Sequence, residues 1–275
     1  MRELGWVDGQ ILIIDYRWAE GDAGRLPGYA AELVREKVDL IVAPAGTAAL
    51  AAKKATSTIP IVMIFPVNPV ELGLVASLRK PGGNVTGTTF APSSEIFGKQ
   101  LQLLKEAIPQ ASRVALLENP ADPTWTIQHK ELEAAAQAMG IRLLPFPATA
   151  PDEFDGAFAA TVRDRANALL VSGSSGFIVH RKRLAESALT HRLPTMFNYR
   201  EMVEAGGLMA YSVNMSEFIG RSAIYVDKIL RGANPADLPV EQPTRFELVI
   251  NLKTAKALGL TIPPSLVQRA DDVIQ

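Results

Sequence analysis

The sequence predicts an α/β protein with two lobes, each built from a parallel sheet flanked by helices. Short apolar runs without polar alternation recur along the chain, and such runs are typical of strands that helices cover on both faces. Segments with helical spacing separate these runs. One long amphipathic helix at 93–107 interrupts the alternation, which begins again at Arg113. The break between the lobes is therefore predicted near Pro109–Arg113.

The first lobe is organised around the apolar strand at Ile61–Ile64. This strand ends at Pro66, and the following Asn68 can cap the next segment. Before it, Leu4 and Gly5 resemble the end of a helix. Further strands are predicted at 11–17, 39–43 and 85–89, and helices at 27–36, 48–55, 69–77 and 93–107.

The second run of elements forms the second lobe. Its strands are predicted at 113–117, 142–146, 168–172, 195–197 and 208–212, and its helices at about 124–139, 153–164 and 178–191. A long helix at 216–231, a strand at 246–251, a helix at 252–258 and a short helical piece near 266–269 are left over. We predict that this tail crosses back, so that lobe 1 comprises 1–110 plus about 216–275 and lobe 2 comprises 111–215. Several crossings of this kind form a hinge.

Composition excludes several classes of function. The chain has 275 residues, 48% hydrophobic and 21% charged, with a net charge of −1. It offers no basic field for nucleic acid. The absence of cysteine excludes disulfides, thiolate chemistry and zinc sites with cysteine ligands. No apolar run approaches the roughly 20 residues that cross a bilayer, and no hydrophobic region of a signal peptide follows Met1–Trp6.

No convergent catalytic set is visible in the sequence. The three histidines, His129, His180 and His191, lack the spacing of a metal site. The segment Ser172–Phe177 follows a strand and precedes a helix, but it lacks the second glycine of a nucleophile elbow. We therefore expect neither an enzyme nor a bound metal or cofactor.

Binding has better support, because polar segments follow most of the predicted strands. In a parallel sheet these segments gather at one edge, where open α/β sheets bind ligands. Each residue alone is most simply interpreted as a cap or a turn former, whereas the set predicts a ligand-binding face. The segments are 44–47, 65–68, 84–89, 118–125, 172–177, 198–200 and 210–214. Trp125, Phe177, Tyr199 and Tyr211 are candidates for stacking on an aromatic ligand.

Several motifs together resemble the ABC-transporter substrate-binding proteins of the tryptophan/tyrosine-uptake type, and the resemblance spans nearly the whole chain. The motifs are Leu4–Gln10, Tyr16–Gly21, Pro81–Gly87, Phe246–Asn251 and Leu258–Pro263. The resemblance implies a type I periplasmic binding protein fold. In this family two lobes close on a small ligand, an aromatic amino acid or a similar carboxylate, and the closed form docks on a membrane permease.

By the same resemblance, the protein is expected in the periplasm, and the ligand contacts come from the predicted loops. The expected contact residues are Thr47, Asn68, Thr86, Asn119, Ser174 and Tyr211. Family members carry an export signal, a strand and most of a helix before the point that matches Met1. We therefore expect this chain to begin after its export signal and first strand. The loss of that strand and of the loop after it would weaken the folding of the first lobe and the affinity for the ligand.

Three alternatives remain open at this stage. The same two-lobed fold serves as the sensing module of regulators and receptors, although this sequence contains no fused DNA-binding or signalling segment. An enzyme on an α/β scaffold would need a catalytic set that the sequence does not show. A late start could also leave a protein that folds but binds poorly.

Overall fold

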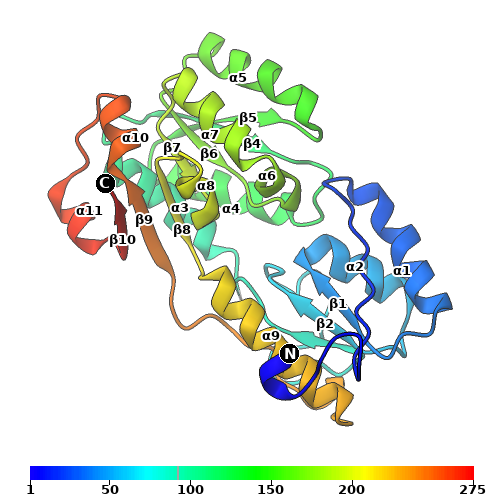
Figure 1. Cartoon of the computed structure of the whole chain (residues 1–275). Coiled ribbons are helices and arrows are strands. Elements are labelled where there is room, and N and C mark those ends of the chain that lie inside the picture. The colour runs from blue at the N-terminus through cyan, green and yellow to red at the C-terminus, as the bar shows by residue number, and fades with distance from the viewer. Residues whose placement is uncertain (92) are drawn as a thin grey trace. The chain divides into compact units, whose positions relative to one another are not determined.

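Two sheets organise the chain, one of three strands and one of seven (Figure 1). The computed structural model describes residues 1–91 and 93–275. The first compact unit comprises Met1–Ser93 and Met215–Thr244, and the second comprises Ser94–Asn214 and Arg245–Gln275. The chain therefore passes between the units three times.

The first unit contains the three-stranded parallel sheet, in the order β1-β2-β3. Its apolar strand β2 lies in the middle and is buried throughout, because it has a strand on each side and α9 contacts it. The elements of this unit are β1 (Ile41–Pro44), β2 (Ile61–Ile64), β3 (Val85–Gly87), α1 (Leu26–Arg35), α2 (Ala45–Ala55) and α9 (Met215–Leu230), with short 3-10 turns η1 (Arg2–Leu4), η2 (Ala23–Arg25) and η4 (Pro235–Asp237). Gly5 ends η1 in the left-handed conformation, as its sequence position predicts.

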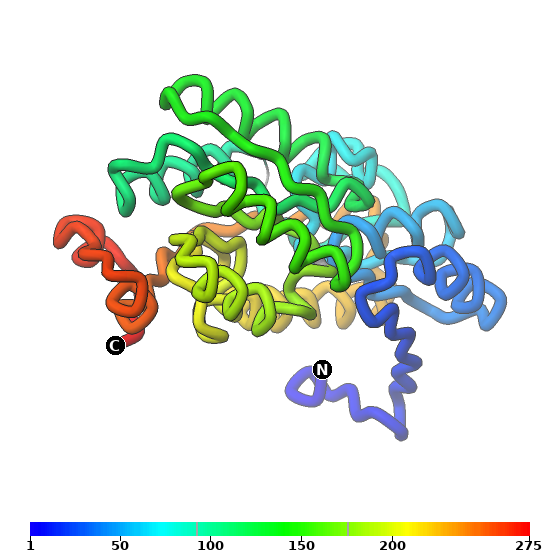
Figure 2. The backbone as a smooth tube through the Cα atoms, turned by 90° about the horizontal axis from the view of Figure 1, so that it is seen from above, coloured from blue at the N-terminus to red at the C-terminus, as the bar shows by residue number. Residues whose placement is uncertain are grey.

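The predicted strand at Ile11–Arg17 is wrong. This segment is extended but pairs with no strand, apart from a single bridge between Asp8 and Leu12. Its apolar side chains are exposed, Ile13 to 87%. The Arg17 guanidinium ties the segment to α1 through Glu32, at 3.1 Å. In Figure 2 the segment is the dark blue trace that leads up to α1.

The predicted helix at 69–77 is also wrong, because the segment forms a series of turns. Gly73 has φ 67, a left-handed conformation that interrupts a helix. The backbone N–H of Leu74 then donates to the Pro69 carbonyl at 2.8 Å, one residue further back than in an α-helix.

The second unit contains the seven-stranded sheet, in the order β10-β9-β8-β7-β6-β4-β5. All neighbours are parallel except β8 and β9. The strands are β4 (Arg113–Glu118), β5 (Arg142–Pro147), β6 (Ala168–Val171), β7 (Thr195–Phe197), β8 (Met209–Ser212), β9 (Glu247–Asn251) and β10 (Asp272–Ile274). The helices are α3 (Glu95–Ala107), α4 (Trp125–Ala138), α5 (Phe154–Arg163), α6 (Ser175–Val179), α7 (Arg181–Thr190), α8 (Arg200–Glu204), α10 (Leu252–Ala257) and α11 (Pro264–Arg269), and η3 (Pro151–Glu153) is a 3-10 turn.

Helices cover both faces of this sheet (Figure 1). Helix α3 packs against α4, whereas α5, α7 and α8 contact one another in sequence. Right-handed crossovers place these two groups on opposite faces, because the chain steps from β4 to β5 in one direction and from β5 to β6 in the other. The central strands β4 and β6 are accordingly buried almost completely.

The boundary between the units differs from the prediction near Pro109–Arg113, since α3 belongs to the second unit. The Gln100 side chain explains this, because it is wholly buried and bonds to Asn198 of the same unit. The segment 245–275 also joins the second unit and not lobe 1 as expected. Its strand β9 pairs with β8 and carries β10 at the sheet edge.

No helix in the described part of the chain combines the length and the apolar character needed to span a bilayer.

Candidate functional site at the strand ends of the second unit

The order of strands reverses at β4, which gives the second sheet a topological switch point. From β4 the chain goes to β5 on one side, and β6 then lies on the other side of β4. The loops after β4 and β6 diverge there, and ligands of open α/β sheets bind outside the carboxyl ends of such strands. These two loops contain the predicted residues Asn119 and Ser174, and Trp125 begins the helix that follows the first loop.

Hydrogen bonds connect the two loops across the switch point. The Asn119 amide donates to Ser174 Oγ at 3.2 Å, and the Ser174 hydroxyl lowers the pKa of the Asp122 carboxyl. Asp122 Oδ1 also accepts from the backbone N–H and the hydroxyl of Thr124, at 2.9 and 2.6 Å. A polar chain from Asn119 to Thr124 therefore lines this edge of the sheet.

Gln128 fixes the position of the loop after β6. Its side-chain amide donates to the Gly173 carbonyl at 2.9 Å and accepts from the Gly173 N–H, also at 2.9 Å. A Cβ added at Gly173 would lie 3.4 Å from Asn198 Oδ1 and 3.6 Å from Gln128 Oε1, at van der Waals distance from both amides. Gln128 thus satisfies the backbone N–H and carbonyl of Gly173, just after the end of β6, as a neighbouring strand would.

A second pair of amides joins the ends of β6, β7 and β8. The Asn198 side chain donates to the Val171 carbonyl. Gln100 donates to Asn198 Oδ1 at 3.0 Å and to the backbone oxygen of Tyr211 at 2.8 Å. The Tyr211 ring itself stacks on Phe246, with centroids 5.5 Å apart.

The electrostatic surroundings of the site are negative. Burial raises the pKa of the Asp122 carboxyl, although hydrogen bonds from Thr124 and Ser174 oppose that shift. Burial also raises the pKa of the neighbouring Tyr199 hydroxyl, and the charges of Asp122 and Glu201 raise it further. Tyr199 therefore stays protonated in any ordinary buffer.

Trp125 begins α4 beside this network, and its ring lies against His129 with centroids 5.5 Å apart. His129 Nδ1 is 2.8 Å from the buried Glu118 carboxylate at the end of β4. Burial lowers the pKa of His129, but Glu118 and Glu133 together raise it more, so the net shift is upward. The ion pair holds the first turn of α4 against β4.

Three buried side-chain atoms in the described structure lack a hydrogen-bond partner, and their residues lie on α3, α4 and α8. They are Gln100 Oε1, Trp125 Nε1 and Glu201 Oε2. Gln100 bridges β7 and β8, Trp125 follows β4, and Glu201 follows β7. Buried polar atoms normally have a hydrogen-bond partner in the protein or in ordered water, so these three atoms are exceptions among the described residues.

The remaining predicted residues have other surroundings. Phe177 is 2% exposed and belongs to the hydrophobic core, with its ring edge-on to Phe154. Its side chain is therefore a core residue and not a stacking surface. In the first unit, Thr86 is 0% exposed and its hydroxyl donates to the Leu238 carbonyl at 2.6 Å. The side chains of Phe177 and Thr86 are therefore both used inside their own units, Phe177 in the hydrophobic core and Thr86 in a hydrogen bond.

Thr47 and Asn68 lie at the strand ends of the first unit. Thr47 is in the first turn of α2 and partly exposed. Asn68 Oδ1 accepts from the Glu71 N–H at 3.4 Å, so Asn68 closes a turn, since no helix follows it directly in the described structure. The backbone there is left-handed at Ala45 (φ 63), Phe65 (φ 65) and Asn68 (φ 46). Left-handed residues other than glycine are costly and gather at functional sites.

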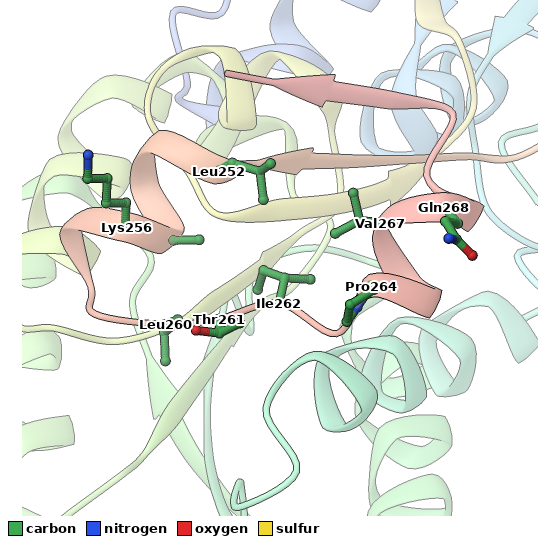
Figure 3. Close-up of a pocket in the computed structure, with 9 residues that line it drawn as sticks. Leu252, Lys256, Leu260, Thr261, Ile262, Pro264, Val267 and Gln268 are labelled. Carbon is green, nitrogen blue, oxygen red and sulfur yellow. The ribbon is translucent and has the colours of Figure 1, made fainter.

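A pocket of about 500 Å³ lies elsewhere, at the C-terminal part of the second unit (Figure 3). It is lined mainly by apolar side chains of α10, α11 and the segment between them, and it includes none of the predicted site residues. No group of three His, Asp or Glu side chains that could hold a metal ion is found among residues 1–91 and 93–275.

Comparison with known proteins identifies the family. The model of the family described as ABC transporter substrate binding protein matches residues 1–274. The chain belongs to this family. It is therefore a substrate-binding protein, a class that binds solutes for import and does not act as an enzyme. This confirms the family and the class of function predicted from the sequence.

Relatives of this substrate-binding protein have known structures or ligands. It is 28% identical, over 94% of this chain and 74% of the relative, to a tyrosine-binding protein of Clostridioides difficile (strain R20291). It is also 28% identical to an ABC domain from Streptococcus pneumonia solved with L-Trp, with a TM-score of 0.90 over 99% of this chain and 91% of that chain.

A more distant structure is similar in fold alone. The leucine-binding protein of Thermotoga maritima is 14% identical, with a TM-score of 0.51 over 78% of this substrate-binding protein and 64% of that chain. The type I periplasmic binding protein fold predicted from the sequence is thereby confirmed.

The sequence predicted the loops of this site but missed several of its residues. Asp122 and Asn198 lie in the predicted polar segments without having been selected as contacts. Gln100 and Gln128 were missed because they lie on helices, where a buried amide is indistinguishable from a solvated one. Their partners are 98 and 45 residues away in the sequence.

Proposed function

We propose that this substrate-binding protein binds an aromatic amino acid or a related aromatic carboxylate, with part of the contact made at the switch point of the second unit. The observation that carries this proposal is the group of three unsatisfied buried atoms on α3, α4 and α8: Gln100 Oε1, Trp125 Nε1 and Glu201 Oε2. A ligand that supplies both donors and acceptors would satisfy them. The tyrosine-binding relative and the relative solved with L-Trp support the aromatic class.

Four of the predicted residues enter the proposed contact. Asn119 and Ser174 supply an amide and a hydroxyl, while Trp125 and Tyr199 supply aromatic surface with one polar atom each. Tyr211, Thr47 and Asn68 stay candidates at the ends of their strands. Phe177 and Thr86 are left out of the proposed contact, since their side chains are used in packing.

We further propose that the protein delivers its ligand to a membrane permease of an ABC importer, in the periplasm, and releases it unchanged. Family membership over residues 1–274 supports this role. It also favours transport over the sensing module considered from the sequence, because the match is to transporter components.

A thermal-shift screen tests the proposed ligand class. We expect L-tryptophan, L-tyrosine or L-phenylalanine to raise the melting temperature, since a ligand at about 100 times its Kd stabilises the folded state by about 2.7 kcal/mol. The variant Ser174→Ala should weaken binding by about 1–3 kcal/mol, because it removes the hydroxyl that accepts from the Asn119 amide. Ser57→Ala, at an exposed position in the loop before β2, is the matched control.

Two results would overturn the proposal. One is a cooperative melt that no aromatic amino acid or aromatic carboxylate shifts. The other is a shift that Ser174→Ala leaves as large as in the unmodified protein.

A further inference from the structure

Arginines gather at the edge of the second sheet where its parallel strands begin, opposite the edge that carries the candidate site. The neighbouring strands β7, β6, β4 and β5 all run in one direction, so their first residues share this edge. Arg113 and Arg142 begin β4 and β5 as register partners. Arg163 and Arg165 precede β6, and Arg192 precedes β7. Since neighbouring strands lie about 4.8 Å apart, these five arginines, the basic edge, spread over roughly 15 Å.

Hydrogen bonds fix the backbone that carries the basic edge. The Arg113 guanidinium donates to the Asp164 carbonyl oxygen, at 2.6 and 3.2 Å. Asn167 Oδ1 accepts from the backbone N–H groups of Ser112 and Arg113, at 3.2 and 3.1 Å. The loops before β4 and β6 are thereby joined, so these arginines belong to one continuous part of the second unit.

Two acidic side chains lie near the basic edge, and each already has a partner. The Asp164 carboxylate is 3.4 Å from Nε of Arg163. At the end of α3, the Glu106 carboxylate is 2.6 Å from the Arg269 guanidinium of α11. Neither acid neutralises the other arginines of the edge.

Most of the positive charge is therefore left for an external partner. Arg142, Arg165 and Arg192 are exposed, and none of these three side chains forms an ion pair or a hydrogen bond within residues 1–91 and 93–275. The whole chain has a net charge of −1, so the basic edge is a local concentration of positive charge. Surfaces of this kind attract anionic partners.

Exposed apolar side chains lie among these charges. Val162, beside Arg163 in the last turn of α5, is 52% exposed, and Leu189 in the last turn of α7 is 39% exposed. The two helices are in contact (Figure 1), and the rings of Phe158 on α5 and His191 after α7 stack with centroids 5.5 Å apart. Charge alone would fit any polyanion. Basic side chains interspersed with exposed apolar ones favour a lipid surface, whose anionic headgroups cover an apolar layer.

We propose that the basic edge binds the surface of a membrane that contains anionic phospholipids. Guanidinium groups bind phosphate through paired hydrogen bonds, and Val162 and Leu189 enter the headgroup layer beside them. The carboxyl ends of the strands, with the candidate ligand site, lie at the other edge of the sheet and stay accessible. This inference goes beyond the proposed function and does not depend on the identity of the transported ligand.

Sedimentation with lipid vesicles tests the proposal. One set of vesicles contains equal parts of phosphatidylglycerol and phosphatidylcholine, and the other contains phosphatidylcholine alone. We expect the unmodified protein to sediment with the first set at low salt and to stay in solution with the second. About 1 M NaCl should release it, because the Debye length then falls to about 3 Å.

A double variant assigns the binding to the basic edge. Arg165→Gln/Arg192→Gln should lower the affinity for the anionic vesicles about 25-fold, since each arginine near such a surface contributes about 5-fold. Both side chains are exposed and without a partner in the described structure, so the melting temperature should not change. Arg181→Gln/Lys182→Gln, at exposed positions in the first turn of α7, removes the same charge from the same unit and is the matched control. It should lower the affinity by less than about 2-fold.

Three results would each overturn the proposal. The first is a protein that sediments with neither set of vesicles, the outcome expected if the partner of the basic edge is an acidic protein. The second is equal sedimentation with both sets, which would show that the anionic headgroups are not recognised. The third is an equal loss of affinity in the two double variants, because net charge and not the basic edge would then govern binding.

Discussion

Replacement of Gly87 by alanine is expected to destabilise the first unit by about 3–5 kcal/mol. Gly87 ends β3 with φ 130, and a Cβ built on it would lie 2.2 Å from the Met63 carbonyl oxygen and 2.9 Å from the Met63 nitrogen. Both atoms belong to the backbone of the central strand β2, which cannot move aside without breaking the pairing of Met63 with Gly87. Backbone strain and overpacking each cost about 1–3 kcal/mol.

Hydrogen exchange followed by mass spectrometry measures this effect for each unit separately, which matters because a protein of two units need not unfold in one step. Amides of β2 and β3 should lose protection in Gly87→Ala, while those of β4 and β6 keep it. Gly83→Ala is the matched control, since Gly83 is exposed and a Cβ there meets nothing within 4 Å. Equal protection in the two variants would show that the close approach at Gly87 is not required.

Replacement of Asn198 by leucine is expected to destabilise the second unit by about 2–5 kcal/mol and to abolish tight ligand binding. Asn198 is 2% exposed, and its amide satisfies the Val171 carbonyl and one N–H of Gln100. Leucine leaves both groups buried and unpaired, at about 1–3 kcal/mol each. The ends of β6 and β7 then lose the bond that fixes them relative to each other.

Urea denaturation of single and double variants measures the contribution of this pair. The double variant Gln100→Leu/Asn198→Leu should cost less than the sum of the single changes, because it removes both partners of one hydrogen bond. Gln137→Leu, an exposed amide on α4, should stay within about 0.5 kcal/mol of the unmodified protein. A single Asn198→Leu variant as stable as this control would contradict the role given to the amide network.

Most strands could be predicted from the sequence because they are short apolar runs, and β2 begins and ends at the predicted residues Ile61 and Ile64. The segment 11–17 also begins with four apolar residues and still forms no strand, because a strand needs a partner and none pairs with it in the described structure. Amino-acid composition sets the tendency of a segment to form a strand, whereas its pairing with another strand depends on the rest of the chain.

Assignment of the last segment failed for a related reason. A strand was predicted at 246–251 and forms at Glu247–Asn251, but its neighbour was not predicted, since antiparallel pairing with β8 is set by tertiary structure. In the candidate site, too, the sequence indicated where the loops lie but not how individual side chains are used. The polar loops could be located from the ends of strands, whereas Phe177 and Ser174, three residues apart, differ in role because one side chain points into the core and the other toward Asn119.

The central claim is that the ligand binds at the switch point of the second unit, and the indole N–H signals of the protein test it most directly. The chain has three tryptophans. Trp6 Nε1 already donates to Asp227 at 2.8 Å, Trp18 is 69% exposed, and Trp125 Nε1 is buried without a partner in the described structure. In a ¹⁵N-labelled sample, with the Trp125 signal assigned through Trp125→Phe, unlabelled L-tryptophan or L-tyrosine should move the Trp125 indole signal downfield and leave those of Trp6 and Trp18 in place. A Trp125 signal that does not move while calorimetry shows the site saturated would contradict the claim.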